Sequence, residues 1–192
     1  MLIFSVIARG STVLAEYAAS TGNFQEIAAH ILEKIPKDDS KMTFVYERYL
    51  FHYIKQNGVT YMCMAGDEFG RRIPFAFLED VSTKFESAFG RDRIETAISY
   101  GLNEFSKTLA SRMEFYSSGN PEADRIRGVQ REIQDVRDIA VANIEKVMER
   151  GDRIDILVDK TDSLNQASFA FKKRSTALRR QMYCARAAYL SI

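Results

Sequence analysis

Few side chains in this 192-residue chain have the types and spacing that catalysis or metal binding requires. The two histidines, His30 and His52, fall on a predicted helix and a predicted strand, and neither belongs to a recognisable metal-ligand pattern, so we expect packing or surface roles for both. Residues 66–70 lack the lysine of a phosphate-binding loop and predict a simple turn. No nucleophile and general base form a recognisable arrangement, so the sequence disfavours an enzyme and predicts no metal or cofactor.

The two cysteines, Cys63 and Cys184, are far apart and have unlike neighbours, so the sequence contains no readable disulfide framework. This usage is typical of a reducing compartment such as the cytosol. Cys63 lies in a predicted strand and is expected to be buried. Cys184 lies in the basic end of the chain and is a candidate for palmitoylation at a membrane surface.

One arginine lies inside a long apolar repeat, where burial would require hydrogen-bond acceptors for its guanidinium group. Residues 122–181 contain no proline and have the composition of a long helix. Alternating steps of three and four residues define sixteen positions, of which eleven are apolar, and this repeat predicts a left-handed coiled coil. The sixteen positions, called the seam below, are Ile126, Val129, Ile133, Val136, Ala140, Asn143, Val147, Arg150, Ile154, Leu157, Thr161, Leu164, Ser168, Phe171, Ser175 and Leu178.

Arg150 lies in the middle of the seam, where a coiled coil would bury its charge. A homodimer would set two arginines against each other, whereas neutral carboxamides from different partner helices could accept the guanidinium N–H groups without adding a second charge. Gly151 lowers helix propensity by about 1 kcal/mol, which suits a segment that becomes helical only with its partners. The alternative is an ordinary solvent-exposed arginine, but the sixteen-position register favours a buried layer.

The elements before the seam predict an α+β domain over residues 1–116. Short apolar runs separated by turn residues indicate strands, and the Asn57-Gly58 pair predicts a two-residue hairpin because both positions tolerate positive φ. The order of the elements predicts a five-stranded antiparallel sheet covered by helices. The predicted strands are Leu2–Ala8, Thr12–Ala18, Met42–Tyr46, Tyr49–Lys55 and Val59–Ala65.

Three helices are expected to cover this sheet. The first begins with a capping box formed by Asn23 and Glu26. The second begins at Pro74 and stops at Gly90. The third extends over residues 94–109, where apolar residues recur at helical spacing.

The charge distribution argues against a general nucleic-acid binder. The chain holds 27 basic and 26 acidic residues, and a net charge of +1 is too small to neutralise a phosphate backbone. Six of the basic residues and no acidic residue lie after Asp162, so residues 1–162 hold 26 acidic and 21 basic residues. The apolar run at residues 1–8 is too short for a membrane span and lacks the basic start of a secretory signal. The six basic residues, which fit a segment attracted to anionic lipid, are Lys172, Lys173, Arg174, Arg179, Arg180 and Arg186.

With Arg150 near their centre, residues 141–154 resemble the middle of an R-SNARE motif, in which an arginine forms the central ionic layer. The strings at residues 2–10, 22–24 and 49–54 are similar to those of a longin domain. The match covers nearly the whole chain. The sequence is therefore identified as a member of the longin-type R-SNAREs of the synaptobrevin family, in the vesicle-associated membrane protein 7 class.

The resemblance implies a profilin-like longin domain over residues 1–116, a linker over 117–121, an R-SNARE motif over 122–181 and a juxtamembrane segment over 182–192. It implies a vesicle-side fusion protein that forms a four-helix bundle with three glutamine SNARE helices, while the longin domain regulates assembly and sorting. The other implied partners are a Sec1/Munc18-type protein, a tethering complex and sorting adaptors, on endosomal, lysosomal, vacuolar or secretory vesicle membranes. Family members have a transmembrane anchor just after the position of Ile192, so we expect one to follow this chain.

The same resemblance implies that a groove beside the third strand and the first helix holds the chain's own SNARE segment. Met42 and Phe44 lie two residues apart and therefore on one face of that strand, near Ile27 and Ile31 if the helix packs there. Without such docking, we expect the motif to be mostly disordered in isolation because its apolar stripe has no partner. Two alternatives, a trafficking adaptor and an enzyme, account less well for the sixteen-position seam.

Overall fold

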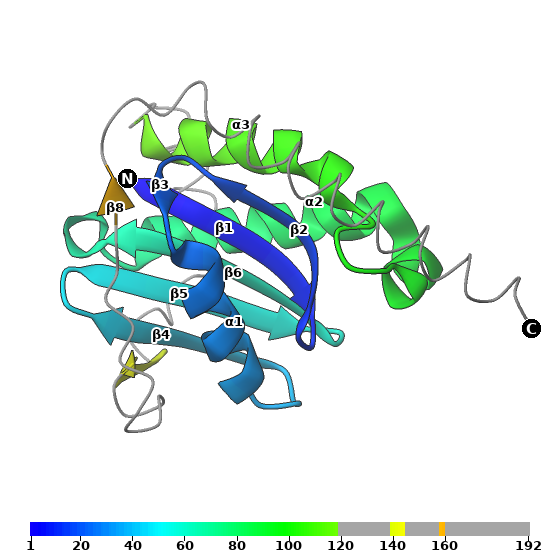
Figure 1. The fold of residues 1–192 in the computed structure, drawn as a ribbon, viewed down its shortest axis with the longest axis horizontal. Helices are drawn as coiled ribbons and strands as arrows, with labels where there is room; N and C mark the ends of the chain where they lie inside the picture. Colours follow the sequence, from blue (N-terminus) through cyan, green and yellow to red (C-terminus); the bar gives the residue numbers. More distant parts are fainter. Residues whose placement is uncertain (119–138, 145–157, 160–192) are drawn as a thin grey trace, which may run out of the picture.

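The computed structural model describes residues 1–118, 139–144 and 158–159. These residues form a mixed sheet whose strand order is β2-β1-β6-β5-β4-β7, together with a two-stranded pair of β3 and β8 (Figure 1). The strands of the main sheet, in that order, are Thr12–Ala18, Leu2–Arg9, Val59–Gly66, Tyr49–Gln56, Ser40–Tyr46 and Ala140–Asn143. The α+β class is confirmed, but the sheet has six strands where five were predicted, because β7 comes from the predicted coiled-coil motif.

The five strands from the amino-terminal domain lie where the sequence predicts them and pair antiparallel. The hairpin between β5 and β6 turns at Asn57 and Gly58, whose φ angles are 53° and 77°. Both angles are positive, as a two-residue hairpin of the primed type requires, so the predicted hairpin is confirmed. Residues 67–69 form a short 3-10 helix, η1 (Asp67–Phe69), in the stretch that predicted a turn.

Helix α1 (Phe24–Lys34) covers one face of the sheet (Figure 1). Its apolar face is buried as predicted, because Phe24, Ile27 and Ile31 are each 1% exposed. The predicted capping box is wrong: the Asn23 side chain makes no capping hydrogen bond. The physical reason is the Asn23 backbone at φ −92° and ψ 30°, which is outside the extended region that a capping residue adopts.

Helices α2 (Arg72–Thr96) and α3 (Ser106–Ser117) cover the opposite face of the sheet (Figure 1). A break inside α2 falls at Gly90, whose φ of 66° and ψ of 163° are accessible mainly to glycine, so the predicted stop at this residue is the position of a kink. The predicted third helix over residues 94–109 is wrong. Residues 97–102 form a loop followed by η2 (Asn103–Phe105), and Ile98, which the helical spacing would bury, is 64% exposed.

The loop over residues 97–102 breaks the predicted helix because it binds the outer edge of β2. The Tyr100 amide donates to the Val13 carbonyl at 2.8 Å, and the Leu102 amide donates to the Leu14 carbonyl at 3.3 Å. Edge strands expose unpaired backbone groups that invite further strand pairing, and here the chain's own loop occupies part of that edge. The opposite edge of the five-stranded sheet, β4, is the edge to which β7 adds.

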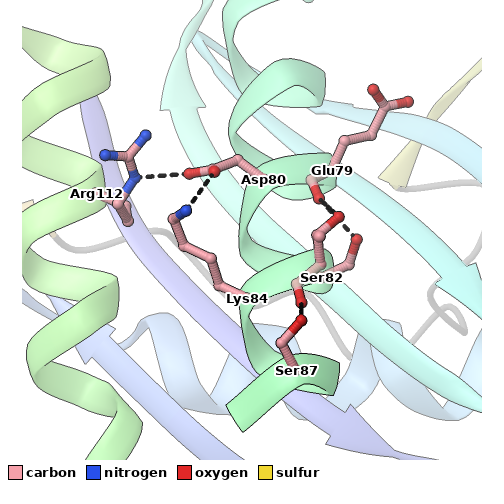
Figure 2. A network of polar contacts seen from close by, with 7 residues as sticks. Glu79, Asp80, Ser82, Lys84, Ser87 and Arg112 are labelled. Carbon is pink, nitrogen blue, oxygen red and sulfur yellow. Dashed lines mark hydrogen bonds and ion pairs between the residues drawn. The ribbon is translucent and has the colours of Figure 1, made fainter.

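The two helices on the second face are joined by a charged network (Figure 2). Arg112 of α3 donates from Nε to Asp80 Oδ2 of α2 at 2.6 Å, and Lys84 lies 3.1 Å from Asp80 Oδ1. The Arg112 guanidinium also lies over the rings of Phe115 and Tyr116, with ring centroids 4.4 and 5.3 Å away. The Arg112–Asp80 ion pair joins α3 to α2, while Lys84 and the two aromatic rings hold the paired side chains in place from within their own helices.

Where the structure describes residues 122–181, which we expect to be helical only with partner helices, the backbone is extended. Residues 140–143 are strand β7, and Val158–Asp159 is strand β8, which pairs with β3 (Thr21–Gly22). Both segments are extended because their backbone groups pair with a neighbouring strand, which is β4 for residues 140–143 and β3 for Val158–Asp159. The other fourteen seam positions, Arg150 among them, the six C-terminal basic residues and Cys184 lie outside the described residues.

Candidate functional site: the edge of strand β4

Strand β7 pairs in parallel with β4, so a segment of the predicted SNARE motif extends the sheet of the amino-terminal domain (Figure 1, yellow beside β4). In this register, Met42 lies opposite Ala140 and Phe44 opposite Ala142. The pairing joins segments about 100 residues apart in the sequence, so no local sequence pattern predicts it. We call this arrangement the closed form.

Side chains on both sides of the docked segment contact the domain. Ile144 is 1% exposed and belongs to the core under α1, and Ala142 packs against the same core. Ile139 packs against the other core, under α2 and α3. Val141 between them is 52% exposed. The docked segment is therefore held at its two ends, on opposite faces of the sheet.

The predicted groove residues lie together with the docked segment. Ile27, Ile31 and Phe44 are buried in the same core as Ile144, and Met42 packs against that core while remaining partly exposed. Met42 and Phe44 come from β4, and the two isoleucines come from the inner face of α1. The structure thus brings all four side chains to one apolar site, and their role in regulation stays a prediction.

Sequence reasoning missed one residue at this edge. Arg71, which precedes α2, donates from Nη1 to the main-chain carbonyl of Ile139 at 3.2 Å. The acceptor is a backbone oxygen, which every residue carries, so no pattern in the sequence could have identified this contact. Arg71 is half-buried and lies on the α2 side of the docked segment, opposite the Ile144 site.

A buried polar pair lies beside the edge on the α2 side. Thr43 Oγ1 and His52 Nδ1 are 3.0 Å apart, and the His52 ring meets Phe75 edge-on at 5.3 Å between centroids. Burial, and secondarily the nearby Arg71 charge, lower the pKa of His52 to about 3. His52 is therefore neutral near pH 7 and acts as a packing residue, as the sequence predicts.

Chemically reactive groups are not gathered at this site. Cys63 is fully buried, and burial raises the pKa of its thiol well above the ordinary range, so the thiol is inert. Within residues 1–118 and the two short docked segments, no three His, Cys, Asp or Glu side chains lie close enough together to hold a metal ion. The arrangement can bind a strand, and its features are those of a protein-interaction site.

The docked segment carries two patterns at once. Ala140 and Asn143 are seam positions, and both are exposed in the closed form. The residues that contact the domain, Ile139, Ala142 and Ile144, are not seam positions. The strand contacts follow a period of two, whereas the seam follows a period near 3.5, so the closed form and the predicted seam use different residues of the segment.

No helix within the described part of the chain has the length and apolar character needed to cross a membrane.

Two separate parts of the chain match known protein families. Residues 14–109 match the longin family, a regulated-SNARE-like domain, and residues 125–192 match the synaptobrevin family. The chain is 47% identical over 184 residues to vesicle-associated membrane protein 7B of Dictyostelium discoideum, a match that covers 95% of this chain and 70% of that protein. It is 44% identical over 185 residues to vesicle-associated membrane protein 714 of Arabidopsis thaliana, covering 95% and 83%. It is 40% identical over 182 residues to vesicle-associated membrane protein 7 of Rattus norvegicus, covering 94% and 82%.

Proposed function

Because this chain belongs to the longin-type R-SNAREs related to vesicle-associated membrane protein 7, we propose that residues 122–181 form one helix of a four-helix bundle with three glutamine SNARE helices. Its family makes it a vesicle-associated SNARE protein and not an enzyme. The sixteen-position seam supports the bundle, because an amphipathic stripe of this length requires partner helices to bury it. Arg150 favours partners that supply neutral carboxamides.

We further propose that the longin domain slows bundle assembly by holding residues 139–144 in the closed form. The observation that carries this proposal is the parallel pairing of β7 with β4. Residues 140–143 cannot be a strand on β4 and a turn of a bundle helix simultaneously, because the two backbone conformations exclude each other. Assembly must therefore draw on the open population, which the closed form reduces.

Replacing Met42 and Phe44 by Ser tests this regulation. Both side chains pack in the core that holds Ile144, so their loss should open the chain and accelerate assembly with glutamine SNARE helices by on the order of tenfold. The assembly rate can be followed by the appearance of a complex resistant to detergent or by the gain of helix in circular dichroism. Lys41→Ser, at an exposed position on the same strand, is the matched control and should assemble at the parent rate.

The longin domain of the double variant must remain folded for the test to hold, since Phe44 is only 3% exposed. Thermal unfolding of residues 1–118 in each variant provides that check. A folded double variant that assembles no faster than the parent would contradict regulation through these two residues.

Other roles follow from the same family assignment. We propose that the basic residues between Lys172 and Arg186 contact anionic lipid, at about 1 kcal/mol for each basic residue near the surface. Palmitoylation of Cys184 and a transmembrane anchor after Ile192 would hold the same end at the membrane. The proposed partners are a Sec1/Munc18-type protein, a tethering complex and sorting adaptors on endosomal, lysosomal or vacuolar membranes. Copurification from native membranes would identify the glutamine SNAREs and hence the fusion step.

A further inference from the structure

We propose that Arg71 is a positioning residue that fixes the amino-terminal end of β7 on the longin domain and so determines where the docked strand begins. This inference rests on the proposed regulatory role of the closed form. The contact that carries it is the hydrogen bond from Arg71 Nη1 to the Ile139 carbonyl, 3.2 Å long and partly buried. It holds the residue directly before the first paired residue of the strand, Ala140.

The docked strand needs a contact at this end because its middle is weakly held. Ala140 and Val141 are exposed, and the small Ala142 side chain buries little area. Parallel pairing is also slightly less stable per residue than antiparallel pairing. Ile144 anchors the carboxyl-terminal end on the α1 side of the sheet, and at the other end the partly buried Ile139 side chain packs against the core under α2 and α3.

Arg71 is suited to this role by its place and by its chemistry. It lies where α2 begins, and the Ile139 side chain packs against the core under α2 and α3. A guanidinium donor makes a hydrogen bond about twice as strong as a neutral donor does. Because the acceptor belongs to the main chain, the bond restrains the backbone of Ile139 whichever side chain is present there. Losing it should release Ala140, a seam position, before it releases Asn143.

Residue-resolved hydrogen exchange of the full chain tests this proposal. Arg71→Met keeps the length and apolar stem of the side chain but removes every donor. It should accelerate exchange of the protected amides nearest Ile139 by about ten- to a hundredfold, the equivalent of one charged hydrogen bond, while those nearest Ile144 keep the parent rate. Arg71→Lys retains a donor and should restore part of the protection. Arg91→Met removes the same charge from an exposed position of α2 that pairs with Glu95, and it should leave exchange in β7 unchanged.

A cross-link at the other end of β7 shows whether the strand remains docked. Val45 and Asn143 lie opposite each other, and neighbouring strands are about 4.8 Å apart, within disulfide range. In a Cys184→Ser background, Val45→Cys with Asn143→Cys should cross-link equally well with Arg71 or Met at position 71. Buried Cys63 should not compete, because its thiol is inaccessible and its pKa is raised.

The outcomes separate this inference from the proposed function on which it rests. Parent-like exchange near Ile139 in Arg71→Met, or equal acceleration along the whole of β7, would overturn the role of Arg71 while leaving the closed form in place. If the parent chain showed neither protection in β7 nor the Val45–Asn143 cross-link, the closed form itself would be wrong, and the inference would fail with it.

Discussion

The contribution of Arg150 to the stability of the proposed bundle depends on the partner side chains that face it. Replacing it by Ala removes the guanidinium donors but leaves the partner carboxamides buried, which costs about 1–3 kcal/mol for each unpaired acceptor. We expect the reconstituted complex to form with a lower unfolding midpoint, because fifteen other seam positions remain. Arg150→Glu should lower the unfolding midpoint further, because its carboxylate oxygens would face the partner carboxamide oxygens, which are also acceptors, and because it carries a desolvated charge. Thermal unfolding of complexes containing each variant measures the difference.

The longin domain serves as the internal control for the Arg150 variants. Its own unfolding should be unchanged, because the central layer acts only in the bundle. Parent-like stability and stoichiometry for the Arg150→Glu complex would mean that Arg150 is solvent-exposed there, and the assignment of the central layer would be wrong.

His52 gives the longin domain a pH-dependent stability. Burial holds the pKa of its ring at about 3 in the folded state, below the ordinary value of 6.5 that the unfolded chain regains. The unfolded state therefore binds the proton first as the pH falls below about 6.5, and the stability present above that pH is progressively lost. Between pH 7.5 and 5.0 the expected loss is about 2 kcal/mol.

Urea unfolding of the parent chain and of His52→Asn at both pH values measures this contribution. Asn can still hydrogen-bond Thr43 but does not titrate, so the variant should be less stable at pH 7.5 and should lose less stability on acidification. The same acid-induced loss in both proteins would assign the effect to other groups.

At the scale of the element, the kink in α2 depends on Gly90. Its φ of 66° and ψ of 163° lie in a region that other residues rarely adopt. An added Cβ would meet no atom within 4 Å, so the cost of Gly90→Ala is backbone strain alone. We expect a loss of about 1–3 kcal/mol in the free energy of unfolding, measured by urea titration.

Ser87→Ala is the control for the Gly90 variant, because it alters an exposed side chain of the same helix. Its effect should stay within about 0.5 kcal/mol. A Gly90→Ala chain as stable as the parent would show that α2 can straighten without losing its packing on the sheet.

At the scale of the whole molecule, the closed form and the bundle compete for residues 139–144. Ile144 and Val141 are both branched apolar residues of this segment, but they are 1% and 52% exposed in the closed form. Ile144→Ser should open the chain because it removes a buried anchor, whereas Val141→Ser should leave it closed. Limited trypsin digestion after Lys146 should therefore be several-fold faster in the first variant than in the second.

This comparison distinguishes the loss of a buried contact from the mere introduction of serine, because both changes replace a branched apolar residue with the same polar one. Equal cleavage rates for the two variants would indicate that the Ile144 site does not hold the segment. A bundle containing Ile144→Ser should still form, because Ile144 is outside the seam.

Local sequence patterns determined much of this protein. The Asn57-Gly58 hairpin, the five strands of the domain and the buried face of α1 follow from turn chemistry and from periods of two and 3.6 residues, which act within a few positions of each other. The seam and its arginine were also predicted from a local signal, the heptad repeat, and their role stays a prediction. The family resemblance rested on these same residues, and the comparisons bear it out.

Only the tertiary structure decided which backbone groups would find partners far away in the chain. The loop at residues 97–102 replaced a predicted helix because its amides bind the β2 edge, and residues 140–143 became a strand because β4 offered an unpaired edge. Arg71 donates a hydrogen bond to a main-chain carbonyl, and no pattern of side chains in the sequence predicts such a contact. Helical periodicity is encoded within one segment, whereas an available sheet edge exists only after the rest of the domain has folded.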